Sequence, residues 1–336
     1  MRANYGVALY GQAFYITNYR SLLKNGAMDQ GKPHQPTRPV SASFTAFGIG
    51  MEADRLQPGL HVVATPIGNL RDISFRGVAT LAAADAIIAE DTRVTKTLLA
   101  HYGITTPLVA YHEHNAAVVR PHLLARLETG AALALVSDAG TPLISDPGFK
   151  LVADAAAAGI NVVAVPGASA VLAALMVAGL PTDRFFFEGF LPPRSAARRQ
   201  RIAELAPIPG TLVFFESPRR LAETLEDLHA VLGGRDAAIA RELTKHYETV
   251  RRGTLGDLAA ALAAEGPPKG EIVLLVSPPG EGGATVSAED LDAKLRKALT
   301  TLSVKDAASV VAAETGQPRR QVYARAVEIV AADRAE

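Results

Sequence analysis

The sequence predicts an α/β protein: two α/β domains followed by a helical C-terminal module. Three observations predict this class. Between residues 60 and 179, short apolar runs alternate with segments of helical spacing, which is typical of a doubly wound parallel sheet. After residue 182 the apolar runs follow one another more closely, and after residue 287 only helical spacing remains. A chain of 336 residues also exceeds one ordinary hydrophobic core.

The first predicted domain covers residues 59–181. Short apolar runs are interpreted as strands, and segments with apolar residues every three or four positions as helices. A glycine follows four of these helices, where a left-handed C-cap is expected. The expected strands are residues 60–65, 86–90, 108–112, 132–138 and 161–167, and the expected helices are 71–84, 92–103, 118–130, 149–159 and 169–179.

The second predicted domain covers residues 182–279, and its last three strands can pair partly antiparallel. The Pro/Gly-rich stretch that follows it is interpreted as a linker, and residues 287–336 as a helical module. The expected strands are residues 210–217, 236–244, 248–255 and 271–278.

Residues 1–58 lack this regular pattern. They show no clear apolar period, and the stretch "GKPHQPTRPVSASF" is rich in Pro, Ser and Thr, which is typical of disorder. They also lack the apolar region and cleavage site of a secretory signal. We therefore expect residues 1–58 to be a disordered extension, with Met28 and Met51 as alternative starts.

Composition excludes several kinds of site. The 34 basic and 34 acidic residues give a formal charge of zero, so a nucleic-acid partner would need local basic patches. Without cysteine there is no disulfide, no thiolate metal site and no cysteine nucleophile. No apolar run reaches the roughly 18 residues of a transmembrane helix. These features predict a cytoplasmic protein without a membrane segment.

The loops after the predicted strands are rich in small and polar residues. They read "ATPIGNLRD", "AEDTR", "VSDAGTPLISDPG" and "VPGASA". Ligands of open α/β sheets bind beyond the carboxyl ends of the strands, where these loops lie. An Asp, Ser or Thr before a helix is also the usual N-cap, and a glycine there is often only a turn. Four such loops at one sheet edge nevertheless predict a small polar ligand.

Common nucleotide and hydrolase motifs are missing from the sequence. It contains no P-loop, no dinucleotide fingerprint after the first strand and no nucleophile elbow. His112 and His114 would share one face of a strand, but a third ligand is not evident, so we expect no metal. Asp91, Asp138 and Asp146 could instead hold Mg²⁺ for phosphoryl transfer, an alternative from another enzyme class.

Eight ordered motifs between Leu60 and Val276 resemble the tetrapyrrole methylase superfamily, and more closely its ribosomal RNA branch. They are "TPIGNLRDISFRG", "AEDTRVT", "SDAGTPLISDPG", "VPGASA", "FEGFLP", "FFESPRRL", "RELTKHYE" and "KGEIVLLV". The resemblance implies two α/β domains with a cofactor cleft between them, usually in a homodimer, and S-adenosylmethionine as methyl donor. It implies methylation of a cytidine ribose 2′-hydroxyl in the decoding centre of 16S rRNA, within the small ribosomal subunit.

The same resemblance implies that loops of both domains hold S-adenosylmethionine, largely through backbone groups. Small side chains in "SDAGTP" would then allow the donor to approach the main chain. The implied contacts are Pro66, Gly68, Asp138, Ala139, Gly140, Thr141, Ser169, Ala170, Phe215, Gly270 and Glu271.

A ribose hydroxyl is a poor nucleophile, so a base or a nearby cation should help to expose its oxygen. The candidates are Asp91, Arg93, Lys245 and Glu248, with Asp146 as a further one. Each could instead form a salt bridge or cap a helix. The sequence does not choose among them.

An RNA substrate requires phosphate contacts from Lys and Arg. The stretch "PPRSAARRQRI" carries Arg194, Arg198, Arg199 and Arg201 without an acid among them, and "PRR" and "VRRG" add two pairs. The alternative is a solvated helix face.

The C-terminal module fits a helix-turn-helix spacing at Ala312, Gly316 and Val322. This spacing would place Arg319, Arg320 and Arg325 on or near a second helix that contacts nucleic acid. The alternative is a plain helical hairpin that covers the core.

The predicted function is therefore S-adenosylmethionine-dependent 2′-O-methylation of 16S rRNA. Methylation of a tetrapyrrole intermediate is the alternative within the superfamily, and the basic clusters argue against it because a small acidic ring needs no extended surface. The Mg²⁺-dependent phosphoryl hydrolase is the alternative outside it. A non-enzymatic RNA-binding module is a further alternative, against which the cofactor loops argue.

Overall fold

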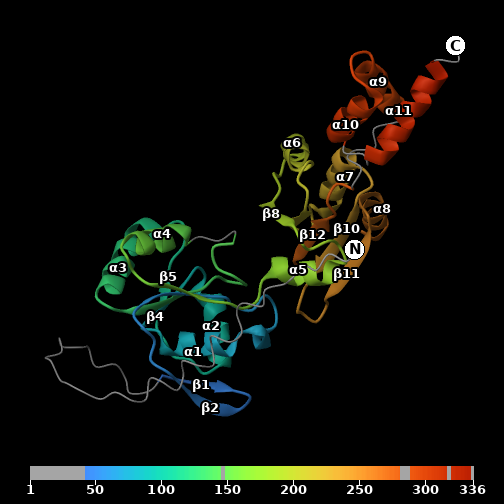
Figure 1. Ribbon diagram of the computed structural model, residues 1–336. Coiled ribbons are helices and arrows are strands. Elements are labelled where there is room, and N and C mark those ends of the chain that lie inside the picture. Colours follow the sequence, from blue (N-terminus) through green and yellow to red (C-terminus); the bar gives the residue numbers. More distant parts are fainter. Residues whose placement is uncertain (1–41, 145–147, 281–287, 316–318, 334–336) are drawn as a thin grey trace, which may run out of the picture. The chain divides into compact units, whose positions relative to one another are not determined.

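The computed structural model describes residues 42–144, 148–280, 288–315 and 319–333 (Figure 1). Asp146, Gly316 and residues 1–41 of the predicted extension lie outside the described residues. The predicted fold class is confirmed: a parallel α/β sheet, a second α/β sheet and a helical C-terminal segment.

The first sheet has five parallel strands in the order β5-β4-β6-β3-β7. Strands β4 and β6 are buried along their whole length, as expected where helices cover both faces of a parallel sheet. The strands are β3 (Gly59–Val63), β4 (Ala86–Ala89), β5 (Leu108–Ala110), β6 (Ala132–Leu135) and β7 (Val162–Val165). The helices are η1 (Leu70–Asp72), α1 (Phe75–Ala83), α2 (Thr92–His101), α3 (Ala116–Glu128) and α4 (Phe149–Ala157).

Two hydrophobic cores lie on the two faces of this sheet. Helices α1 and α2 contribute side chains such as Leu81 and Leu98 to one core, and α3 and α4 contribute Leu123 and Leu151 to the other. The loops between β3 and α1, β4 and α2, β6 and α4, and β7 and α5 (Ala170–Ala178) all start at the carboxyl ends of parallel strands. The chain leaves the neighbouring strands β3 and β6 in opposite directions, toward β4 and β7, which is the type of switch point where ligands bind.

The second sheet has the order β11-β10-β12-β9-β8, in which only the β8–β9 pair is parallel. Helices α6, α7 and α8 cover one face, with the buried side chains of Ile202, Leu225 and Leu258. The strands are β8 (Phe185–Phe190), β9 (Thr211–Glu216), β10 (Asp236–Arg241), β11 (Thr249–Thr254) and β12 (Ile272–Val276). The helices are α6 (Ser195–Leu205), α7 (Leu221–Leu232) and α8 (Leu255–Glu265).

Helix α5 packs against the other face of the second sheet. Its side chains Ala174 and Leu175 share a core with Ala240 of β10 and Leu275 of β12. Helix α5 follows directly after β7 of the first sheet in the sequence, but its side chains pack on the second sheet. The predicted domain boundary at residue 181 lies just after this helix.

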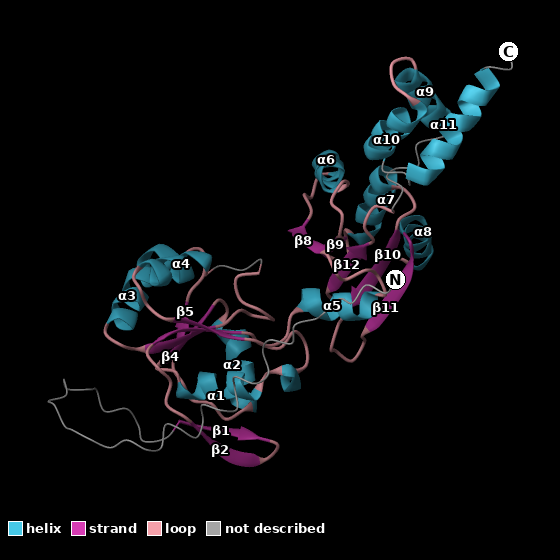
Figure 2. Cartoon of the chain, viewed as in Figure 1, coloured by secondary structure: helices cyan, strands magenta, loops and turns pink. Residues whose placement is uncertain are grey.

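The structure differs from the predicted disorder at residues 42–53, which form a hairpin of β1 (Ala42–Ala46) and β2 (Ile49–Ala53) (Figure 2). Alternate residues of β1 point inward, so Phe44 and Ala46 are buried in the core that contains α1 and α2. The Thr45 amide donates to the Tyr102 carbonyl at 2.7 Å. The sequence pattern did not reveal this hairpin, because Phe44 and Ala46 are its only buried side chains.

The C-terminal helices are α9 (Ala288–Leu299), α10 (Val304–Thr315) and α11 (Arg319–Asp333). They enclose a small core of their own, with Leu295, Val311 and Val322 at its centre. Within the described part of the chain, no helix combines the length and the apolar character that spanning a bilayer requires.

Candidate active site

Two cavities lie beside the loops of the predicted cofactor site. The first, of about 350 Å³, is lined by the loop after β3, by α2, by the loop after β6 and by Lys245. The second, of about 480 Å³, is lined by the loop after β6, by β9, β10 and β12, and by Phe190. Both linings contain Ile67, Asp138, Ala139 and Glu271. The two cavities thus share one wall, and Asp138 belongs to that wall.

Hydrogen bonds join the loops of the first sheet at its carboxyl edge. Thr65 and Gly140 exchange backbone hydrogen bonds of 2.8 and 3.1 Å, which link the loops after β3 and β6. The Thr141 hydroxyl donates to the Ala168 carbonyl at 3.1 Å, which adds the loop after β7. The Asp91 amide donates to Asp138 Oδ1 at 2.9 Å, which adds the loop after β4. Asp138 is therefore held in a defined orientation by the backbone of a neighbouring loop.

Lys245 and two carboxylates form the charged side of the first cavity. Its Nζ donates to Glu242 Oε1 and to Glu271 Oε2, both at 2.9 Å. The Glu271 amide donates to Glu242 Oε1 at 2.9 Å, so Glu242 orients both the lysine and the start of β12. Burial lowers the pKa of Lys245, but the hydrogen bonds to Glu242 and Glu271 outweigh it, and the net pKa is raised. Lys245 is therefore a permanent cation at neutral pH.

The backbone of the loop after β10 is strained. Glu242 and Thr244 have φ values of 52° and 64°, in the left-handed region that non-glycine residues rarely adopt. The Thr244 hydroxyl is buried, and among the described residues it has no hydrogen-bond partner. A Cβ atom at Gly68 would lie 2.4 Å from Lys245 Cγ, so a side chain there would displace the lysine.

Asp91 and Arg93 form an exposed pair at the N-terminus of α2. Asp91 caps the helix by accepting from the Arg93 amide at 2.8 Å, and its Oδ2 lies 2.6 Å from Arg93 Nη2. The hydrogen bonds from the Arg93 side chain and amide lower the pKa of Asp91 to about 2. By contrast, burial and the neighbouring Asp138 raise the pKa of Glu90. A carboxylate that binds protons as weakly as Asp91 is a poor general base.

The structure groups most of the implied cofactor residues around the two cavities. Pro66, Gly68, Asp138, Ala139, Ala170, Phe215, Gly270 and Glu271 line one or both cavities. Gly140, Thr141 and Ser169 stand behind them: the first two join loops, and Ser169 caps α5 by accepting from the Leu172 amide at 3.4 Å.

Of the four candidates for base or cation, Lys245 lines a cavity, whereas Asp91, Arg93 and Glu248, all in the described part of the chain, lie outside both linings. Glu248 accepts from the Thr244 amide at 2.6 Å and so holds the strained loop closed. Two residues of the site were not predicted from the sequence. Phe190, at the end of β8, lines the second cavity, and its ring centroid lies 5.7 Å from that of Phe215. Glu242 stands behind the first cavity as the partner of Lys245. Phe190 stands in the quoted motif "FEGFLP", so a signal for it was present.

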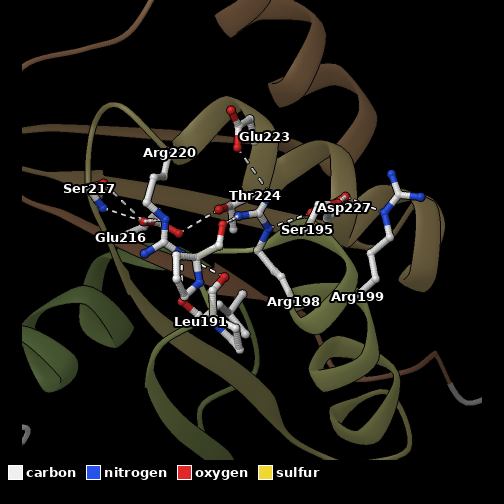
Figure 3. Close-up of polar contacts among 12 residues, drawn as sticks. Leu191, Ser195, Arg198, Arg199, Glu216, Ser217, Arg220, Glu223, Thr224 and Asp227 are labelled. Atoms are coloured by element: carbon white, nitrogen blue, oxygen red, sulfur yellow. Dashed lines mark hydrogen bonds and ion pairs between the residues drawn. The ribbon is translucent and has the colours of Figure 1, made fainter.

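The predicted RNA-binding role of Arg198 is wrong, because its side chain is only 1% exposed. Figure 3 shows the polar contacts that surround it. Arg198 Nε donates to Asp227 Oδ2 at 2.6 Å, and Ser195 donates to the same carboxylate. Arg199 Nε donates to Asp227 Oδ1 at 2.5 Å, although half of the Arg199 side chain remains exposed. Arg198 and Arg199 therefore connect α6 to α7, whereas Arg201 pairs with Glu188 of β8 at 2.6 Å and with Glu204 of α6 at 2.8 Å.

The remaining RNA-binding candidates are exposed. Arg194 lies before α6, and Arg319 and Arg320 begin α11. Arg325, also on α11, is paired instead with Asp292 at 2.6 Å and with Glu328 at 2.7 Å. The roles of Arg194, Arg199, Arg319 and Arg320 in RNA binding stay predictions.

The described residues give no support to the alternative of a Mg²⁺ site at Asp91, Asp138 and Asp146. Among them, no three His, Asp or Glu side chains gather as metal ligands. Asp91 and Asp138 meet through a backbone amide, and Asp146 lies outside the described residues.

Two family models match the chain. Residues 59–259 match "Tetrapyrrole (Corrin/Porphyrin) Methylases", and residues 285–329 match the "RsmI C-terminal HTH domain". The β1–β2 hairpin precedes both matches.

Curated relatives match most of the chain. "Ribosomal RNA small subunit methyltransferase I" of Mesorhizobium japonicum is 51% identical over 82% of this chain and 93% of its own length. The protein of the same name from Escherichia coli O157:H7 is 46% identical over 82% of this chain and 97% of its own.

Solved structures agree on the fold. A diphthine synthase covers 66% of this chain and 90% of its own, at 18% identity and a TM-score of 0.52. A cobalt precorrin-4 methyltransferase covers 65% and 94%, at 19% identity and a TM-score of 0.51. With the relatives above, these matches show that the chain belongs to the ribosomal RNA small subunit methyltransferase I family of tetrapyrrole methylases.

Proposed function

We propose that this protein transfers a methyl group from S-adenosylmethionine to ribosomal RNA of the small subunit. The observation that carries the proposal is the pair of cavities with a shared wall at Asp138, one charged through Lys245 and the other lined by aromatic and aliphatic side chains. One cavity suits a polar end of the donor and the other its planar base. The names of the curated relatives supply the substrate class.

The residues present fit S-adenosylmethionine. Phe215 and Phe190 offer ring surfaces, and Leu243 and Ile272 offer apolar area for a purine. Asp138 and Glu271 bring carboxylates to the wall that both cavities share, where a positively charged ligand is favoured. The Thr244 hydroxyl, which lacks a partner among the described residues, is a further polar group beside Gly68.

When bound, S-adenosylmethionine supplies a methyl group on a positively charged sulfur. The chain's own contribution is orientation and charge. Lys245, held by Glu242 and Glu271, is protonated, so it would favour the deprotonated form of an acceptor hydroxyl placed beside it, whose proton would pass to solvent because Lys245 itself accepts none. Asp91, with a pKa of about 2, orients α2 and Arg93 and is not the proton acceptor.

We further propose a cytidine ribose 2′-hydroxyl in the decoding centre of 16S rRNA as the methyl acceptor, and a cytoplasmic homodimer as the active form. A base or a nearby cation helps to expose the oxygen of a ribose hydroxyl, and Lys245 is a cation that lines the first cavity. The family resemblance of the eight motifs supports the site and the dimer.

The decisive experiment is methyl transfer from labelled S-adenosylmethionine to small ribosomal subunits isolated from a strain that lacks this activity. Nuclease digestion and mass spectrometry would map the label, which we expect on one cytidine ribose. Label on a base, or on another nucleotide, would overturn the 2′-hydroxyl assignment. Binding of the donor without label on subunits would favour a small-molecule methylase.

The donor site has a separate test in Asp138. Asp138→Asn keeps an oxygen for the Asp91 amide but removes the charge, whereas Asp138→Ala removes both. Titration calorimetry should show S-adenosylmethionine bound about tenfold more weakly by Asp138→Asn and weaker still by Asp138→Ala, since a hydrogen bond to a charged group contributes about 1.5–3 kcal/mol. Unchanged affinity in both variants would remove Asp138 from the donor site.

A further inference from the structure

A third cavity, of about 300 Å³, lies at the tip of the β1–β2 hairpin. Phe47 comes from the hairpin tip, Arg71 and Phe75 from η1 and the start of α1, and His101 and Tyr102 from the end of α2. We call these five residues the aromatic pocket. The hairpin precedes residue 59, where the match to the methylase family begins, so Phe47 is an addition to the family domain.

Two rings of the aromatic pocket, Phe47 and Phe75, are open to solvent, whereas Tyr102 is buried. Phe47 is 84% exposed and Phe75 62% exposed, with ring centroids 6.0 Å apart and ring planes at 52°. His101 meets Tyr102 edge to face at 4.8 Å. The Tyr102 hydroxyl donates to the Leu70 carbonyl at 2.7 Å, which anchors this wall to the loop that leads from the first cavity. The two phenylalanine rings contact each other, and their exposed faces offer an apolar surface on which a flat group can stack.

Phe47 occupies a backbone position that disfavours it. The two-residue turn Phe47–Gly48 has φ values of 53° and 76°, so both residues lie in the left-handed region, as in a type I′ turn. Asn or Gly is preferred at the first position of such a turn, and a bulky side chain there is an outlier. An 84% exposed ring gains little burial to offset this strain. The hairpin itself therefore gives no reason for a phenylalanine at this position.

One cation accompanies the rings. Arg71 is exposed in the pocket wall, although Asp72 beside it adds one carboxylate. Of the cations on α2, Arg93 is paired with Asp91, and Lys96 lines a different cavity with Thr92 and Ala100. The acidic Glu52 of the hairpin pairs with Ser43, away from the tip.

We propose that the aromatic pocket binds an unstacked nucleobase of the RNA substrate, with a neighbouring phosphate at Arg71. Aromatic rings beside an arginine are the surface on which splayed bases of single-stranded RNA stack. Leu70, whose carbonyl accepts from Tyr102, also lines the first cavity, so one loop borders both the proposed base site and the Lys245 cavity. This inference rests on the proposed function, because it assigns a second contact to the same substrate.

The test compares full-length variants in steady-state methylation of the same small subunits. Phe47→Asn suits the turn better than phenylalanine, so it should keep or raise the melting temperature, yet it removes the ring. We expect Phe47→Asn and Phe75→Ala to raise KM for subunits about tenfold or more, with kcat and S-adenosylmethionine affinity unchanged. Phe47→Trp should restore KM. Ile49→Ala is the matched control, because Ile49 is 65% exposed on the same hairpin but stands outside the pocket lining.

Each outcome decides the matter. Unchanged KM in Phe47→Asn and Phe75→Ala, with an active wild-type protein, would overturn the nucleobase pocket and leave the proposed function standing. A lower melting temperature with parallel losses in kcat and donor affinity would also overturn it, in favour of a structural hairpin. Ultraviolet cross-linking should join the Phe47 or Phe75 peptide to RNA, and cross-links to a ribosomal protein alone would reassign the surface. An inactive wild-type protein would refute the proposed function first, and the pocket with it.

Discussion

At the scale of single residues, the position of the Lys245 ammonium group depends on two carboxylates that the sequence places 29 residues apart, Glu242 and Glu271. The antiparallel pairing of β10 and β12 sets Arg241 opposite Ile272 and so brings these carboxylates together. The motifs "RELTKHYE" and "KGEIVLLV" pointed to both loops, but only the strand register shows that they share one lysine. Glu242 was missed for that reason.

Replacing Lys245 by methionine tests its role. We expect kcat for methyl transfer to fall about 10²- to 10³-fold, the size of loss seen when one preorganised charge-stabilising group is removed, because the acceptor hydroxyl loses the cation that favours its deprotonated form. Lys245→Arg, which keeps the charge, should retain part of the rate. Because the pKa of Lys245 is raised above its usual 10.5, the wild-type rate should show no loss from its deprotonation between pH 6 and about 9.

The matched control for Lys245 is Lys269→Met, since Lys269 is exposed in the neighbouring loop and stands outside both cavity linings. Its kcat should stay within about twofold of wild type. Equal losses in both lysine variants would point to a general effect of charge and would remove Lys245 from the reaction.

At the scale of elements, the periodicity of the sequence predicted the strands and helices of the first sheet correctly, but the buried face of α6 was not recognised. Strands β3 to β7 and their helices lie where the alternation of short apolar runs and helical segments predicted them, because each element buries its apolar face against a neighbour. On α6, by contrast, the RNA-binding prediction relied on the number of arginines and did not consider which face of the helix each one occupies. Arg198 precedes the buried Ile202 and Leu205 by four and seven residues, so it lies on the buried face. That spacing was visible in the sequence and contradicts an RNA contact.

Asp227→Asn tests how strongly α6 and α7 depend on the buried ion pair. Removing one partner leaves the Arg198 guanidinium buried without its main counter-charge, and we expect a loss of about 3–5 kcal/mol in the free energy of unfolding at pH 7. Urea unfolding measures this loss. The exposed pair between Arg201 and Glu204 provides the control, because Glu204→Gln should cost less than about 1 kcal/mol.

The same pair predicts a pH dependence. Burial raises the pKa of Asp227, but the hydrogen bonds from Arg199, Arg198 and Ser195 outweigh it and the net pKa is lowered. Its contribution to stability is therefore complete above the unfolded value of about 3.9 and is lost as the pH falls through the lower folded pKa. The stability difference between wild type and Asp227→Asn should be constant from pH 7 to about 5 and should narrow below pH 4. A constant difference down to pH 3 would contradict the ionised pair.

At the scale of the whole molecule, the hydrophobic cores divide the chain more clearly than the sequence did. The first sheet has a core on each face, and the core of α9, α10 and α11 consists of side chains from these three helices and the residues beside them. Helix α5 belongs by packing to the second sheet, which no local pattern reveals, because a helix that is apolar on all sides can pack on either sheet. The hairpin at residues 42–53 was not predicted because most of its side chains are exposed, so its sequence lacks a clear apolar pattern.

Removing residues 281–336 tests whether the C-terminal helices are needed for RNA methylation but not for folding or donor binding. Because α9 to α11 have their own core, the remaining chain should fold and bind S-adenosylmethionine with unchanged affinity in calorimetry. Methylation of small subunits should fall at least tenfold through a higher KM, since Arg319 and Arg320 are lost with the helices. In the full chain, Arg319→Ala with Arg320→Ala should lessen the slope of log affinity against log salt by about one to two. Full methylation by the shortened chain would contradict an RNA-binding role of the C-terminal helices.

The position of β12 sets an order for biosynthesis. β12 is the last strand to be translated, yet it lies between β10 and β9 in the middle of the second sheet. Until residues 272–276 leave the ribosome, the sheet consists of two separate ribbons, β8–β9 and β10–β11, each with an unpaired apolar edge. All strands of the first sheet have been translated by residue 165, so this sheet can fold before β12 is available to join the two ribbons. Nascent chains that stall between residues 254 and 271 should therefore be the form of this protein most prone to aggregate and most in need of a chaperone.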